Sequence, residues 1–132
     1  MKMNIFLAPL VLGIFSAPVA AAEISTHVLD LAKGVGGTDV PVKLSQRDDA
    51  GKWVVVSEGR TDANGRVRAF GNGRNFEPGI YQLQFDMTAY PDASVKPFFP
   101  EITVTFSVSN AAGHYHVPVV VSPYGYSTYR GN

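Results

Sequence analysis

Short runs of strand-forming residues, separated by turn signals, dominate the chain from residue 23 onward and restrict its fold most strongly. Turn residues such as Asp62-Ala63-Asn64-Gly65 and Pro78-Gly79 separate these runs at intervals of about ten residues. The runs cover residues 24–31, 40–46, 52–57, 66–70, 80–87, 102–108 and 115–121, with a weaker one at 125–130. Seven to eight short strands with this spacing predict an all-β, antiparallel β-sandwich.

One interval breaks the pattern of alternation. Residues 88–100 contain Pro91, Pro97 and Pro100, which disfavour regular structure. This interval leaves room for at most one short helix. With 132 residues, of which 45% are hydrophobic, the chain is long enough for one domain with a modest core.

Charge and cysteine content exclude several classes of function. The formal net charge is zero, so nothing electrostatic favours binding to nucleic acid or to an anionic membrane surface. The chain has no cysteine, which excludes disulfides, zinc-thiolate sites and a thiol nucleophile.

The N-terminus has the layout of a secretory signal peptide. A short start containing Lys2 precedes an apolar run over 5–15, and small residues follow over 16–22. The apolar run is too short to span a bilayer comfortably. We expect cleavage after Ala22, a mature domain of residues 23–132, and a location in the periplasm if the host is Gram-negative. An uncleaved anchor or a buried N-terminal helix is the alternative.

The parity of the 115–121 strand separates an inner from an outer face, because alternate residues of a strand share a face. Its odd-numbered positions are β-branched or aromatic and suit the sandwich interior. His114 and His116 then point outward, with apolar residues behind them, as in a pocket or an interface. By the same rule His27 lies on the face of the first strand opposite Ile24 and Val28.

Each of these signals has an ordinary structural interpretation. A single histidine on a strand is usually a hydrogen-bonded structural residue, and Arg66 after a glycine turn would be a solvated turn residue. The pair His114 and His116 could chelate a metal, but such a site needs further ligands nearby. No nucleophile elbow, P-loop or zinc-protease motif is present. Composition and spacing therefore lead to a secreted β-sandwich with an unexplained histidine face.

Several separated motifs resemble the transthyretin-like family, and in particular its 5-hydroxyisourate hydrolase branch. The likeness extends over the whole chain from about residue 23, with the motifs in family order. The matching stretches are Ser-Thr-His-Val-Leu-Asp at 25–30, Thr-Asp-Ala-Asn-Gly-Arg at 61–66, Phe-Phe-Pro-Glu-Ile at 98–102, His-Tyr-His-Val-Pro at 114–118, Ser-Pro-Tyr at 122–124 and Ser-Thr-Tyr-Arg-Gly at 127–131.

The resemblance implies a set of site residues. The catalytic positions would be His27, Arg66 and His116. The substrate-binding positions would be His27, Arg66, Tyr129, Arg130 and Asn132. Asn132 stands where the family usually has serine, and its amide can orient a substrate but cannot shuttle a proton as a hydroxyl can. No metal and no cofactor are implied.

The resemblance also implies an activity and an assembly. The activity is hydrolysis of the cyclic amide of 5-hydroxyisourate in urate degradation. The assembly is a homotetramer, a dimer of dimers, with His27, His116 and Tyr129 facing a channel between the dimers.

Two alternatives remain open. One is a transthyretin-type small-molecule carrier without catalytic activity, and the other is a structural or metal-binding sandwich that uses His114 and His116. The presence of His27, Arg66 and His116 together favours the enzyme, because a carrier does not need these groups to converge.

Overall fold

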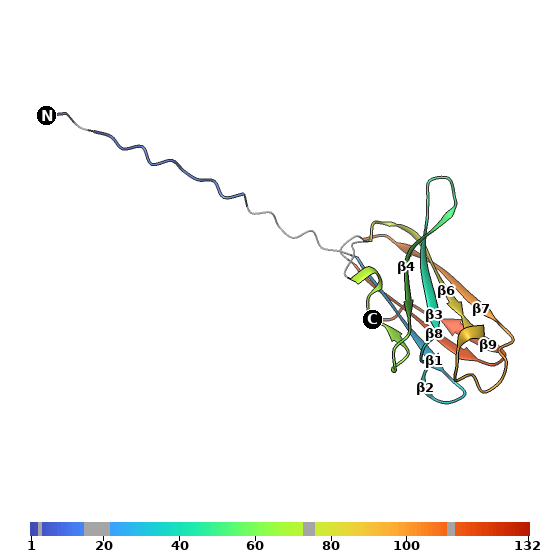
Figure 1. Cartoon of the computed structure of the whole chain (residues 1–132). Coiled ribbons are helices and arrows are strands. Elements are labelled where there is room, and N and C mark those ends of the chain that lie inside the picture. Colours follow the sequence, from blue (N-terminus) through green and yellow to red (C-terminus); the bar gives the residue numbers. More distant parts are fainter. Residues whose placement is uncertain (3, 15–21, 73–75, 111–112) are drawn as a thin grey trace.

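The computed structural model describes residues 1–132 except 3, 15–21, 73–75 and 111–112. The described residues form nine strands and two short 3-10 turns, arranged as a sandwich (Figure 1). The strands are β1 (Glu23–Asp30), β2 (Val35–Gly36), β3 (Pro41–Arg47), β4 (Trp53–Arg60), β5 (Arg66–Val67), β6 (Gly79–Asp86), β7 (Glu101–Val108), β8 (His114–Ser122) and β9 (Gly125–Thr128). The turns are η1 (Phe70–Asn72) and η2 (Met87–Ala89).

Two sheets make up the sandwich. One has the strand order β2-β1-β8-β9, with β5 paired to β1 as well, and the other has the order β4-β3-β6-β7. β8 runs along one edge of β1, so the two short strands share its other edge. β5 pairs there through Arg66 with His27, and β2 pairs through Gly36 with Leu29.

The pairing of β1 with β8 corrects the expectation of a purely antiparallel sandwich. These two strands run parallel over eight residue pairs, from Glu23 with His114 to Asp30 with Val121. A hairpin forces its strands to be antiparallel, but β1 and β8 come from opposite ends of the domain and are joined through all the intervening strands. The other strand pairs are antiparallel.

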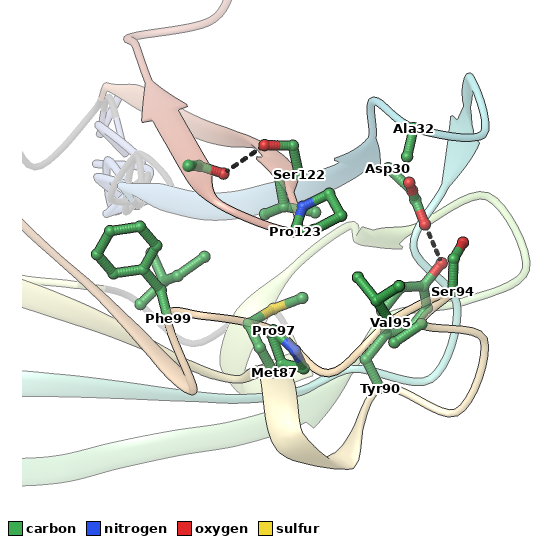
Figure 2. A pocket seen from close by; sticks show the side chains of 14 residues that line it. Asp30, Ala32, Met87, Tyr90, Ser94, Val95, Pro97, Phe99, Ser122 and Pro123 are labelled. Atoms are coloured by element: carbon green, nitrogen blue, oxygen red, sulfur yellow. Dashed lines mark hydrogen bonds between the residues drawn. The ribbon is translucent and has the colours of Figure 1, made fainter.

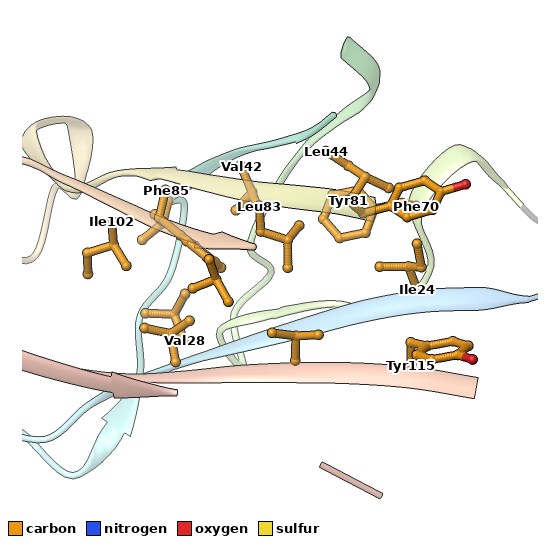
Figure 3. Close-up of a cluster of buried hydrophobic side chains, with 14 of the residues drawn as sticks. Ile24, Val28, Val42, Leu44, Phe70, Tyr81, Leu83, Phe85, Ile102 and Tyr115 are labelled. Carbon is orange, nitrogen blue, oxygen red and sulfur yellow. The ribbon is translucent and has the colours of Figure 1, made fainter. Parts of the chain in front are cut away.

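The core lies between the sheets (Figure 3). Ile24 and Val28 of β1 face Leu44 of β3 and Tyr81 and Phe85 of β6, and each of these side chains is at most 1% exposed. Burying a side chain of this size contributes roughly 1.5–3 kcal/mol. The inner face predicted for β8 is confirmed, because its odd-numbered residues between 115 and 121 are all buried.

The all-β sandwich is confirmed, and the differences from the predicted strands are local. β2 and β5 are two-residue strands, which raises the number of strands to nine. The run over 66–70 stops pairing after Val67, and Phe70 turns into the core in η1. Residues 90–100 contain no helix or strand, as the prolines predicted.

The N-terminal residues differ from the domain. Residues 4–14 are exposed and form neither helix nor strand. Among the described residues no helix is long and apolar enough to cross a membrane. Most of the predicted cleavage region, 16–22, lies outside the described residues. Ala22 is described, and it is fully buried and forms a β-bridge with Phe76.

Candidate active site

The three predicted catalytic side chains lie on the outer face of the sheet that contains β1. His27 on β1 and Arg66 on β5 are partners in register. His116 on β8 is the partner of Ser25, which lies two residues before His27 on the same strand face. Thr26, between them, points into the core and is fully buried.

The turn before β5 determines where Arg66 lies. Oδ1 of Asp62 accepts hydrogen bonds from the backbone N–H groups of Asn64 (2.9 Å) and Arg66 (3.0 Å). Gly65 has φ of 76°, and a Cβ there would overlap the carbonyl oxygen of Val28. The N–H of Val28 donates to the Gly65 carbonyl at 2.8 Å. The turn is therefore locked against β1, which places Arg66 beside His27.

His116 is held on two sides. Its Nδ1 lies 2.8 Å from Oγ of Ser25, across the β1–β8 pair. Its carbonyl oxygen accepts a hydrogen bond from the N–H of Gly131 at 2.8 Å. A Cβ on Gly131 would lie 2.5 Å from Cδ2 of the imidazole, so the backbone of Gly131 is packed against the ring.

A polar cleft of about 180 Å³ opens over these residues. Its lining contains two arginines and two histidines, an arrangement that suits an anionic or carbonyl-rich ligand. The lining residues are Ser25, Thr26, Arg66, Val67, Arg68, His114, His116 and Asn132. His27 lies next to the cleft, as the register partner of Arg66.

Both site histidines are shifted toward the neutral form. Burial lowers the pKa of His27 and of His116 below the 6.5 usual for histidine, and the charge of Arg66 is the second cause for each ring. A hydrogen bond with the Asn64 backbone and the charge of Asp62 oppose the pKa shift at His27. Both pKa shifts favour the neutral ring, which is the form that can accept a proton.

The residues of the C-terminal tail lie in two different places on the molecule. Asn132 lines the cleft with Arg66 and His116. Arg130 instead has its guanidinium 5.0 Å from the ring centre of Tyr115, a core residue of β8. Tyr129 and Arg130 border a separate groove beside β7, and Tyr129 is 58% exposed. Within one chain, the structure brings Asn132 to the cleft but neither Tyr129 nor Arg130.

His114 lies at the rim of the cleft rather than among the central groups. Its Nδ1 is 3.1 Å from Oε2 of Glu23, and both side chains are at least half exposed. Within the described ranges, no group of three or more His, Cys, Asp or Glu residues gathers in a way that could hold a metal ion. The pair His114 and His116 therefore has no third ligand of these types among the described residues.

Two polar residues of the cleft, Ser25 and Arg68, were not among the predicted site residues, and Gly131 was named only as part of the matching C-terminal motif. Strand parity alone places Ser25 on the face of His27. Its contact with His116 depends on the register of two strands that are distant in sequence, which no local pattern specifies.

A second pocket, smaller and largely apolar, lies at the end of the sandwich near η2 (Figure 2). Its volume of about 40 Å³ has room for only a few water molecules. The hydroxyl of Tyr90 donates to Oδ2 of buried Asp30 at 2.9 Å, and the N–H of Lys33 donates to Oδ1 at 3.2 Å. Burial is the main cause that raises the pKa of Tyr90, so its hydroxyl stays protonated.

Comparison with known proteins places this geometry in a family. The model of the HIUase/Transthyretin family matches residues 24–131. The chain belongs to this family. A 5-hydroxyisourate hydrolase of Salmonella dublin is 38% identical over 138 residues, covering all of both chains. One of Caulobacter vibrioides is 42% identical over 115 residues, covering 83% of this chain and 97% of its own.

Solved structures of the family agree with the fold. The 5-hydroxyisourate hydrolase of Klebsiella pneumoniae superposes with a TM-score of 0.72 at 28% identity, over 84% of this chain and 99% of its own. Sea bream transthyretin in complex with thyroxine also superposes with a TM-score of 0.72, at 30% identity, over 82% of this chain and 93% of its own. A hydrolase and a hormone-binding protein thus share this sandwich, and the function must be argued from the site.

Proposed function

We propose that this protein hydrolyses the cyclic amide of 5-hydroxyisourate to 2-oxo-4-hydroxy-4-carboxy-5-ureidoimidazoline, a step of urate degradation. The observation that carries the proposal is the convergence of His27, Arg66 and His116 on one outer sheet face beside a polar cleft. Relatives named 5-hydroxyisourate hydrolase match the chain over most or all of its length.

The chemistry fits the groups at the cleft. A water loses a proton and attacks the ring carbonyl, the carbon–nitrogen bond breaks, and the departing nitrogen takes up a proton. A neutral histidine can accept the first proton and return it, and such general acid-base catalysis contributes roughly 10²–10⁴ in rate. The planar fork of Arg66 can hold the carbonyl oxygen as charge develops on it, which contributes roughly 10²–10³.

The tail takes part in two ways in this proposal. Asn132 lines the cleft and can orient the substrate through its amide, in place of the usual serine hydroxyl. Tyr129 and Arg130 lie outside the cleft of their own chain, so their contact with substrate requires the assembled channel.

The assembly we propose is a homotetramer, a dimer of dimers. β7 and β9 are at the ends of their sheets, so each has one edge without a neighbouring strand in the described part of the chain, and such an edge can pair with another chain. Phe98, Tyr124 and Tyr126 are large and exposed, at 66%, 77% and 42%, which is typical of a surface that a partner covers. Light scattering at micromolar concentration should give a tetramer, and a monomer would contradict this part of the proposal.

Export to the periplasm is also proposed, on the basis of the N-terminal residues. The exposed, apolar segment over 5–14 contrasts with the domain, which is packed from Ala22 onward. The mature chain should begin near Glu23. The intact mass of protein from the periplasmic fraction tests this, and full-length protein in the cytoplasm would contradict it.

The competing function is that of a carrier, supported by the likeness to thyroxine-bound sea bream transthyretin. The two functions make opposite predictions in one assay. Freshly generated 5-hydroxyisourate loses its ultraviolet absorbance when it is hydrolysed. Purified protein should accelerate this decay well above the spontaneous rate, in proportion to protein concentration, whereas a carrier would leave the rate unchanged.

A further inference from the structure

The ring of His116 is more tightly constrained than a surface histidine needs to be. We infer that Ser25 and Gly131 are positioning residues that hold this imidazole as the base of the site, with its Nδ1–H donated to Ser25 and the lone pair of Nε2 directed into the cleft. The kinetic part of this inference rests on the proposed function, but the assignment of the ring proton does not.

Ser25 is suited to this role by its position. It is 5% exposed although it lies on the outer face, because His116 and the other residues of the cleft cover it. Its Oγ is 2.8 Å from Nδ1, a normal hydrogen-bond distance. The hydroxyl is fixed by a strand pair that keeps its register over eight residue pairs, so the ring has a rigid partner.

The direction of this hydrogen bond follows from the charges around the ring. A serine hydroxyl can donate or accept, so distance alone does not assign the proton. Arg66 has only donors and a fixed positive charge, and it is close enough to lower the pKa of His116. Nδ1 is already engaged by Ser25, so Nε2 is the nitrogen left for the cleft that His116 lines together with Arg66. Beside that positive charge, a lone pair on Nε2 is more stable than an N–H. The proton therefore resides on Nδ1 and is donated to Ser25.

Gly131 constrains the other side of the ring. A Cβ at this position would lie 2.5 Å from Cδ2 of His116 and 3.1 Å from Cγ of Pro118, so no larger residue fits unless the ring moves. The hydrogen bond from the Gly131 N–H to the His116 carbonyl keeps the two backbones together. Glycine is needed here for close approach, and the ring carbon that it contacts is adjacent to Nε2.

The inferred step balances. Nε2 takes a proton from the attacking water, which leaves an imidazolium that still donates Nδ1–H to Ser25. As the carbon–nitrogen bond breaks, the same proton passes from Nε2 to the departing nitrogen, and the neutral ring returns. Ser25 stays hydrogen-bonded throughout and exchanges no proton.

Nitrogen chemical shifts of the His116 ring at neutral pH test the assignment directly. The resonances can be assigned by their loss in His116→Gln. The inference predicts a protonated Nδ1 and an unprotonated Nε2 in the wild-type protein. The opposite tautomer would overturn it. This measurement needs no substrate, so it stands even if the protein failed to hydrolyse 5-hydroxyisourate.

Substitution of the serine separates hydroxyl chemistry from packing. Ser25→Ala should lower kcat by about 10-fold to 10²-fold with little change in KM, because the ring is misplaced rather than the substrate lost. Ser25→Thr keeps the hydroxyl and should recover most of the loss. Ser45→Ala, which truncates a buried serine in the other sheet, should leave the rate unchanged. Equal losses in Ser25→Ala and Ser25→Thr would contradict a role for the hydroxyl.

Alanine substitutions at two glycines of the C-terminal region, Gly131 and Gly125, serve as a test and its control. Gly131→Ala should displace the ring, lower kcat by a similar factor and change the nitrogen shifts of His116. Gly125→Ala places its Cβ 3.7 Å from the nearest atom, Oγ of Ser122, and should have no effect on either. A Gly131→Ala variant with parental kcat and parental shifts would show that the contact does not position the ring.

Discussion

Two sites in this molecule contain buried or half-buried polar residues, and the two sites differ in their chemistry. In the small pocket near η2, the carboxylate of Asp30 accepts from the hydroxyl of Tyr90 (Figure 2). It also accepts from the backbone N–H of Lys33. In the cleft, His116 has one nitrogen at Ser25 and presents its remaining ring edge to a polar cavity. The Asp30 carboxylate is hydrogen-bonded to other groups of the protein, whereas His116 is hydrogen-bonded to the protein on one side and borders the cleft on the other.

The difference shows which buried polar residues can act on a ligand. A polar group whose partners all belong to the protein stabilises the fold, because breaking it would leave a buried charge unpaired. A group that is oriented on one side and open on the other can bind or transfer a proton at little cost in stability. The cleft is also more than four times the volume of the pocket, at about 180 against 40 Å³.

The largest difference between the two regions should appear when a central cleft residue is removed. His27→Ala, Arg66→Ala and His116→Ala should each lower kcat/KM by roughly 10²–10⁴. These side chains lie on the outer face and fill no core space, so melting by circular dichroism should stay close to that of the parent. A variant that keeps its rate would remove that residue from the catalytic set.

Deletion of residues 129–132 should have the next largest effect on the rate. The deletion removes Asn132 from the cleft and Gly131 from the His116 ring, and misplacement by about 1 Å can cost roughly 10²-fold. The loss of stability should be only ~1–3 kcal/mol, because Tyr129 is mostly exposed and the β8 core is intact. Normal melting together with the parental rate would show that the tail is not part of the site.

The pH dependence of kcat/KM should report the protonation of His116. A catalytic base must be neutral, and burial and Arg66 lower the pKa of His116, so the acid limb of kcat/KM should lie below pH 6.5. Below 6.5 the unfolded chain binds protons that the folded histidines resist, so the free energy of unfolding should also fall as pH drops from 6.5 toward the lowered pKa values. An acid limb above 6.5 would contradict the assigned base.

The smallest effects on the rate should come from substitutions at His114 and Asn132. His114→Ala removes an exposed side chain whose hydrogen bond with Glu23 is open to solvent, and should lower the rate only a few-fold. Asn132→Ser should leave the rate unchanged or raise it. If His114→Ala proved more damaging than His116→Ala, the roles of the two histidines would have to be exchanged.

Much of the fold could be predicted from local patterns. Alternation located the long strands to within a few residues, and turn residues such as Gly65 marked their ends. The parallel β1–β8 pair and the short strands β2 and β5 could not be predicted, because they depend on contacts between distant segments.

The same distinction between local patterns and contacts of distant segments applies to the candidate site. His27, Arg66 and His116 were identified through motifs, and strand parity placed the two histidines on outer faces. The tail is expected to face a channel of the assembled tetramer. Within one chain, its pairing with β8 in β9 ends at Thr128, and Gly131 and Asn132 return to His116 and the cleft. The contact of Ser25 with His116 joins residues 91 positions apart and required the three-dimensional register.

One paired measurement tests the contrast most directly: initial rates on 5-hydroxyisourate and thermal melting, both on His116→Ala and Tyr90→Phe. Tyr90→Phe removes one of the two donors to the buried Asp30 carboxylate, and should cost about 1.5–3 kcal/mol of stability with no change in rate. His116→Ala should do the reverse, with a rate at least about 10²-fold lower and nearly normal melting. Parental activity in His116→Ala, or loss of activity in a folded Tyr90→Phe, would contradict the assignment of catalysis to the cleft.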